Sequence, residues 1–283
     1  MDISIKDYIK YFNEIIIELT PKNILEEGEH TFINVSEKSK NYFHIYFNDN
    51  DTEQQIKNIT NDENVNKIRI VIDGEVMSFK DLFKNYKCLK KINIIKCNRK
   101  NIKNMYSMFE NYSSLIELNI DKLKTDKVET MRAMFCGCSS LRNLNFSNFN
   151  TKNVQTMYGM FSHCSSLTDL NINNFDTSNV KNMAGMFYKC SSLEELDVIN
   201  FNTDNVMNFR EMFYECNSLI DLDISNFNMK RGQKTKYMFT GCSKQLQELV
   251  KSQNKKLKKD VFYNPFDNAY TMFDYNSNKY IHD

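Results

Sequence analysis

The 283-residue sequence has no tryptophan and only seven glycines and two prolines. This scarcity excludes collagen-like and proline-rich linker architectures, and it leaves too little glycine for a loop that cradles phosphate. Neither sign of charge is in excess, because 37 Lys and Arg residues are balanced by 36 Asp and Glu residues. A globally basic nucleic-acid-binding protein and an acidic disordered chain are therefore both disfavoured.

Long apolar runs are missing as well. No stretch approaches the roughly 18 apolar residues that would predict a transmembrane helix. The run Ile15–Ile17 follows Lys6, Lys10 and Glu14, so no signal peptide is visible. From these absences we expect a chain that stays in the cytoplasm or leaves by a route that the sequence does not show.

A repeat dominates what the sequence does contain. Six Met-Phe pairs follow one another at steps of 26 residues, and Leu82-Phe83 is a weaker copy one step earlier. Leucine, aromatic and valine positions keep the same step. Such periodicity indicates a repeat protein, in which each unit has one apolar face that only stacking can bury. The pairs begin at Met108, Met134, Met160, Met186, Met212 and Met238.

Each period divides into two parts with different apolar spacing. Leu141, Leu144 and Phe146 follow the L-x-x-L-x-L pattern of leucine-rich repeats and predict a short strand. An apolar stripe from Val154 to Cys164, at offsets 0, 3, 6, 7 and 10, predicts a short helix. We therefore expect strand, turn, short helix and turn in every repeat.

The sequence thus predicts an α/β fold, a leucine-rich-repeat solenoid with parallel strands on one face and short helices on the other, plus an α/β N-terminal cap. The expected domains are the N-terminal cap at 1–75, six to seven 26-residue repeats at 76–249, and a C-terminal cap or tail at 250–283. Capped ends are what stacked repeats require for solubility.

Local patterns predict elements inside both caps. Apolar spacing from Ile5 to Leu19 predicts a helix, and residues 31–35, 42–47 and 68–72 predict strands, the last of which we expect to pair with the first repeat. The C-terminal aromatic residues are expected to cover the last repeat. They are Phe262, Tyr263, Phe266, Tyr270, Phe273 and Tyr275.

The segment from Met160 to Val180 resembles the repeat of the BspA-type leucine-rich repeat surface proteins, because Cys164, Leu167 and Thr177 all stand at the positions of that 26-residue pattern. The resemblance covers about residues 76–249. It implies a protein that binds macromolecules, lacks enzymatic activity and belongs to a class of secreted or lipid-anchored adhesion proteins. The sequence shows no lipid-attachment cysteine near its start, so cell-surface and cytoplasmic locations both remain open.

Five of the eight cysteines also recur every 26 residues. Stacked repeats would bring neighbouring cysteines to about 5 Å, within the range of a disulfide or metal ladder. We favour buried packing instead, because Tyr86 and Tyr112 occupy the same position in earlier repeats. Cys136-x-Cys138 lacks a second pair, and the recurring Ser-Ser pairs are expected to form turn hydrogen bonds. The five are Cys138, Cys164, Cys190, Cys216 and Cys242.

Outward positions of the predicted strands carry the most informative polar residues. Seven of the fifteen side chains in these three columns are acidic and none is Lys or Arg, which predicts a binding face for a basic or amide-rich protein. A solvated polar face is the alternative. The candidate ligand-binding residues are Glu117, Asn119, Asp121, Asn143, Asn145, Asp169, Asn171, Glu195, Asp197, Asp221 and Asp223.

The leading hypothesis is a non-catalytic scaffold of the surface and adhesion class that binds a protein or matrix ligand through these strands. The alternative is an intracellular adaptor of the same fold. No catalytic residue, metal, cofactor or nucleic-acid partner is expected, and the four histidines show no spacing that marks a metal or hydrolase site. The run from Lys255 to Lys259 is interpreted as a solvated helix face, with anionic partners as the alternative.

Overall fold

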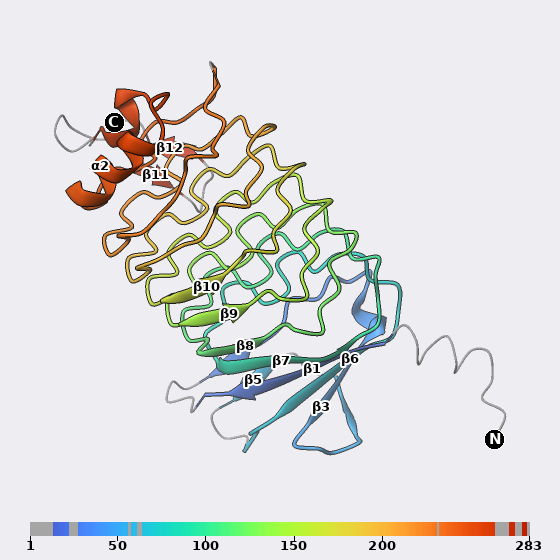
Figure 1. Cartoon of the computed structure of the whole chain (residues 1–283). Helices are drawn as coiled ribbons and strands as arrows, with labels where there is room; N and C mark the ends of the chain where they lie inside the picture. The colour runs from blue at the N-terminus through green and yellow to red at the C-terminus, as the bar shows by residue number, and fades with distance from the viewer. Residues whose placement is uncertain are drawn as a thin grey trace.

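The computed structural model describes residues 14–22, 28–55, 58–60, 64–230, 232–263, 272–274 and 279–281 (Figure 1). The N-terminal region folds into strands, a stack of turns follows, and α2 lies near the other end. The elements are β1 (Ile15–Pro21), β2 (Glu29–Thr31), η1 (Lys40–Tyr42), β3 (Phe43–Phe47), β4 (Glu53–Gln54), β5 (Asn58–Thr60), β6 (Ile68–Ile72), β7 (Leu89–Cys97), β8 (Glu117–Asn119), β9 (Asn143–Asn145), β10 (Asp169–Asn171), α2 (Lys244–Gln253), η2 (Lys259–Phe262), β11 (Met272–Asp274) and β12 (Lys279–Ile281).

A six-stranded mixed sheet begins the fold, in the order β4-β3-β6-β1-β7-β8. β1 runs antiparallel to both of its neighbours, β6 and β7, whereas β7 and β8 run parallel. The prediction that 68–72 pairs with the first repeat is wrong, because β1 lies between β6 and β7. The strand at 68–72 itself is confirmed as β6, and the strand predicted at 42–47 as β3.

The helix predicted from residue 5 to residue 19 is wrong where the structure describes it. β1 buries Ile15, Ile17 and Leu19 and leaves Ile16 and Glu18 half-buried, which is the period of two of a strand. Its isoleucines are β-branched residues that favour extended backbone. Residues 5–13 of that prediction lie outside the described residues. Of the strand predicted at 31–35, only residue 31 belongs to a strand, β2.

Repeats stack in register along the rest of the chain. Each repeat contributes a short extended segment to one side of the stack, which we call the strand side. On this side β9 and β10 pair in parallel, and Glu195 pairs with Asp221 in an isolated bridge. A ladder of isolated parallel bridges joins the opposite side at steps of 26 residues, from Ser78 to Lys234. Between the two sides, buried phenylalanine rings stack at centroid distances of 5.4–5.7 Å. They are Phe83, Phe109, Phe135, Phe161, Phe187, Phe213 and Phe239.

The short helices predicted on that opposite side are wrong, because the Met-Phe segments are chains of tight turns. Ala133 (φ 49°) and Gly137 (φ 76°) are left-handed, and equivalent positions in the neighbouring repeats are left-handed too. A right-handed helix cannot continue through such a residue. The Cys136 amide instead closes a turn onto the Ala133 carbonyl at 3.2 Å, and the Phe135 amide donates to Met160 of the next repeat at 2.9 Å.

The predicted fold class, an α/β leucine-rich-repeat solenoid, is therefore wrong. The described residues form a mixed sheet and a stack of strands and turns, with α2 as the one α-helix. Ser243 caps α2 by accepting a hydrogen bond from the Leu246 amide, and Leu246 and Val250 are buried. No helix within the described ranges is long and apolar enough to cross a membrane.

Part of the predicted aromatic tail does contact the last repeat. The Phe239 amide donates to the Val261 carbonyl at 2.8 Å, the Phe262 ring stacks on Phe239, and Tyr263 stacks on Tyr237. Phe266, Tyr270 and Tyr275 lie outside the described residues, as does the side chain of Phe273.

Candidate functional site: an acidic groove on the strand side

The predicted binding residues lie on the strand side in two main columns of outward side chains, which we call the strand face. Nearly all of them are exposed, and Asp121 is half-buried. The first column is Glu117, Asn143, Asp169, Glu195 and Asp221, and the second is Asn119, Asn145, Asn171, Asp197 and Asp223.

Six of these residues meet around one groove of about 410 Å³. Glu117, Asn119, Asp121, Asn143 and Asn145 do not line it. The sequence prediction did not include Thr168 and Asn173, which the structure adds to the lining. We call this feature the acidic groove. Its lining consists of two leucines, Leu170 and Leu196, and of the polar residues Thr168, Asp169, Asn171, Asn173, Glu195, Asp197, Asp221 and Asp223.

Five carboxylates face the acidic groove and no Lys, Arg or His is among its lining residues. Glu195 and Asp221 are direct partners across neighbouring repeats, at the roughly 4.8 Å spacing of paired strands. Like charges placed opposite each other in this way repel. None of the ion pairs found among the described residues involves these five carboxylates, so their mutual repulsion is not offset within the described chain.

The second column has a structural task that the sequence did not reveal. In each repeat its side-chain oxygen accepts a hydrogen bond from the amide two residues later, which holds the turn after the strand. Asn171 accepts from Asn173 at 3.2 Å, and Asp223 accepts from Ser225 at 2.8 Å. Asn119, Asn145 and Asp197 make the same contact at 3.0–3.1 Å.

Asparagine and aspartate perform this task equally, because both offer a side-chain oxygen. The turn therefore does not require the negative charges of Asp197 and Asp223. Hydrogen bonding from the Ser225 amide, followed by its hydroxyl, lowers the pKa of Asp223. The carboxylate at this corner of the acidic groove is thus ionised at neutral pH.

Charge on the strand face is arranged differently in the earlier repeats. Glu117 of the first column forms an ion pair with Lys91 at 2.6 Å, across the paired strands β7 and β8. The second column carries only asparagine there. Within these two columns, negative charge without an ion pair is therefore confined to the last three repeats.

Two exposed apolar side chains lie close in sequence to the carboxylates of the acidic groove. Ile199 follows Asp197 and is 44% exposed, and Ile220 precedes Asp221 and is 49% exposed. Single exposed isoleucines are common on protein surfaces. These two bracket the carboxylates of neighbouring repeats, so the strand face there combines negative charge with apolar flanks.

The cysteine column is a packing feature with a regular hydrogen bond. Each thiol donates to the phenylalanine carbonyl 29 residues earlier, as Cys164 does to Phe135 at 3.1 Å. The equivalent contacts of Cys138, Cys190, Cys216 and Cys242 span 3.0–3.1 Å. Burial raises the pKa of all five thiols. Such thiols are poor nucleophiles and poor metal ligands, since both roles need the thiolate.

Histidine and serine side chains are likewise engaged in local contacts. His44 lies between Glu53 at 3.1 Å and Asp73 at 3.2 Å, and His163 meets the Ser162 hydroxyl at 3.0 Å. Ser140 donates to the Ser113 carbonyl of the preceding repeat, which fits the predicted role of the recurring serines. Within the described ranges, no group of three His, Cys, Asp or Glu residues is placed to hold a metal ion.

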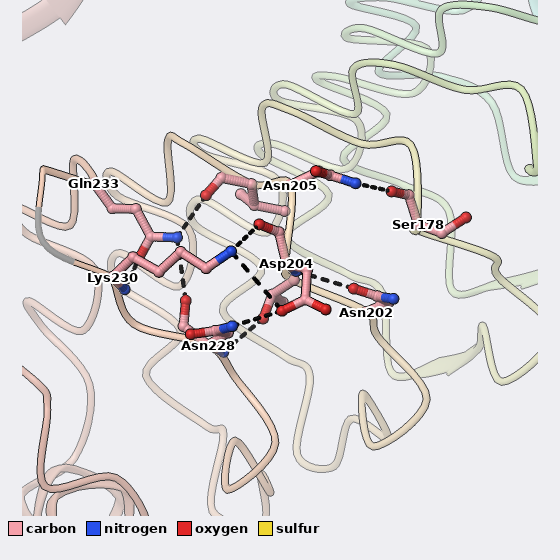
Figure 2. Close-up of polar contacts among 9 residues, drawn as sticks. Ser178, Asn202, Asp204, Asn205, Asn228, Lys230 and Gln233 are labelled. Atoms are coloured by element: carbon pink, nitrogen blue, oxygen red, sulfur yellow. Dashed lines mark hydrogen bonds and ion pairs between the residues drawn. The ribbon is translucent and has the colours of Figure 1, made fainter.

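A second polar cluster lies where the repeat pattern decays (Figure 2). Asn228 donates to the Asp204 carboxylate and the Lys230 ammonium to the Asp204 carbonyl, both at 2.5 Å. Gln233 donates to the carbonyls of Val206 at 2.6 Å and Asn228 at 3.1 Å. These side chains join one turn to the next, so we assign the cluster to the structure of the stack.

A family model described as "Mycoplasma protein of unknown function, DUF285" matches residues 77–171 and 141–253. The two matches together span the stacked repeats, the acidic groove and α2. No curated protein and no solved structure matches the chain significantly.

Proposed function

The chain belongs to the DUF285 family of Mycoplasma proteins of unknown function, and we propose a function from its own geometry. It is a non-catalytic binding module whose acidic groove holds a basic segment of a partner protein. The observation that carries this proposal is the set of five carboxylates around one groove that has no basic lining residue. Complementary charge steers such a partner and fixes its register.

The extent of the groove favours a segment of chain over a single ion. The carboxylates are spread over three repeats, or about 10 Å at the strand spacing. A bound metal needs its oxygen ligands within about 2.0–2.6 Å of one point. A peptide with several Lys or Arg side chains can instead meet carboxylates of successive repeats at once.

The state of the cysteine thiols, which are potential nucleophiles, supports the proposal that the module is non-catalytic. The buried thiols are hydrogen-bonded to carbonyls and have raised pKa values. The resemblance to surface and adhesion proteins adds a partner class, so we propose lysine-rich segments of matrix proteins as the first ligands to try. An intracellular adaptor would use the same groove for the same chemistry.

Direct titration tests the proposal. A fluorescent lysine-rich peptide should bind the wild-type chain, and its affinity should fall about tenfold in the triple variant Asp197→Asn, Asp221→Asn and Asp223→Asn, at roughly half a kcal/mol for each exposed pair. The two second-column substitutions keep the turn, since Asn171 already performs it. Added salt should weaken wild-type binding more than variant binding.

Asp126→Asn is the matched control for the single variant Asp223→Asn, because each removes one charge and Asp126 does not line the groove. Its affinity for the peptide should equal that of the wild type. Equal binding by the triple variant would remove the acidic groove from the proposal.

A further inference from the structure

A basic surface follows the acidic groove in the sequence, directly after α2. Lys255, Lys256, Lys258 and Lys259 are exposed, while Leu257 between them packs against the core. We call these five residues the lysine run. None of the ion pairs among the described residues involves its ammonium groups.

The backbone of the lysine run is firmly held. Asn254, directly before it, donates to the carbonyls of Ile224 at 3.4 Å and Phe227 at 2.9 Å. After it, the Tyr237 amide donates to the Asp260 carbonyl at 3.0 Å and the Phe239 amide to the Val261 carbonyl at 2.8 Å. The four lysines are therefore presented on a fixed frame, and binding them costs little ordering of the backbone.

The whole chain has a net charge of only +1, yet charge is segregated within its C-terminal third. We propose that the acidic groove of one copy receives the lysine run of a second copy, so that the chain associates with itself. This inference rests on the proposed function, because it uses the same groove and names a partner for it.

The two surfaces are opposite in charge. Four lysine side chains would face five carboxylates, and one of them, Lys258, also donates to the Gln233 carbonyl at 3.3 Å. The three repeats that carry the carboxylates span about 10 Å, which is long enough to meet several lysine side chains at once. Association would also cover the exposed Ile199 and Ile220, whose removal from water favours the complex.

Every molecule carries both surfaces, so two copies related by a twofold axis can exchange lysine runs reciprocally. A closed pair makes each contact twice. This doubling is what distinguishes a second copy from an unrelated basic protein with one lysine-rich segment.

Sedimentation velocity over a range of concentrations tests the proposal with the full chain. The wild type should associate at low salt and dissociate as salt is raised. The groove variant Asp197→Asn, Asp221→Asn and Asp223→Asn should associate at least tenfold more weakly. The run variant Lys255→Gln, Lys256→Gln, Lys258→Gln and Lys259→Gln should show the same loss.

A mixing experiment sharpens the test. Each variant keeps the surface that the other lacks, so an equimolar mixture should associate more strongly than either variant alone. A control with Lys124→Gln and Lys127→Gln, exposed lysines of an earlier repeat, should associate as the wild type does.

A wild-type chain that stays monomeric at low salt and high concentration would overturn the inference, as would a mixture no stronger than its components. Peptide binding separates this failure from failure of the proposed function. A monomeric chain that still binds the lysine-rich peptide would keep the acidic groove as a site for other proteins and exclude the second copy as its occupant.

Discussion

The interior of the repeats and their strand face differ in how far the residue type at equivalent positions changes from one repeat to the next. The stacked phenylalanines and the hydrogen-bonded cysteines keep one residue type through successive repeats. The second column of the strand face changes from asparagine to aspartate at Asp197, and the first column loses the ion pair that Glu117 makes with Lys91. Stacking demands the constant positions, so the changing ones are where a function specific to the last repeats is expected.

Removing a ring from the interior should have the largest effect on stability. Phe161 is fully buried and stacks on Phe135 at 5.6 Å and on Phe187 at 5.7 Å. Phe161→Ala should lower the free energy of unfolding by about 3–5 kcal/mol, which urea denaturation measures. Ile199→Ala on the strand face should change it by less than about 0.5 kcal/mol. Equal losses at the two sites would contradict the division between interior and strand face.

A smaller loss is expected at the left-handed turns. Gly159 has φ 60°, and a Cβ there would meet only the Ser162 Cβ at 3.8 Å. Left-handed backbone costs an alanine about 1–2 kcal/mol, so Gly159→Ala should destabilise the chain by that amount. In a helix the same substitution would stabilise it by about 1 kcal/mol. The sign of the change in urea midpoint therefore decides between turn and helix.

These turns show why part of the fold could not be read from the sequence. One left-handed position is filled by Asp81, Ser107, Ala133, Gly159, Gly185, Glu211 and Tyr237, which share no residue type. Backbone pairing with the next repeat stabilises that conformation against local preference. The second left-handed position gave only a partial signal: Asn85, Asn111, Gly137 and Gly241 tolerate left-handed backbone well, whereas the three repeats between Gly137 and Gly241 carry other residue types there.

The strand side was easier to predict because alternation fixes which side chains face outward. That rule placed Asp169, Glu195 and Asp221 on one face, where the structure brings them together. It could not show the hydrogen bonds that the second column makes to its own turns. It also could not show that β1 pairs with β7, because Ile15–Leu19 fits helical and extended spacing alike.

The smallest expected effect concerns the acid response of the strand face. The pKa of Asp223 is lowered by hydrogen bonds from Ser225, so on acidification the unfolded chain takes up this proton first, near the ordinary value of about 4. The stability that ionised Asp223 contributes is therefore present above that pH and is lost as pH falls through the lower folded pKa. Asp223→Asn keeps the turn and lacks this titration. Its urea midpoint should lie slightly below that of the wild type at neutral pH and fall less steeply below about pH 4, whereas parallel curves would show that the Ser225 hydrogen bonds do not favour the charged form.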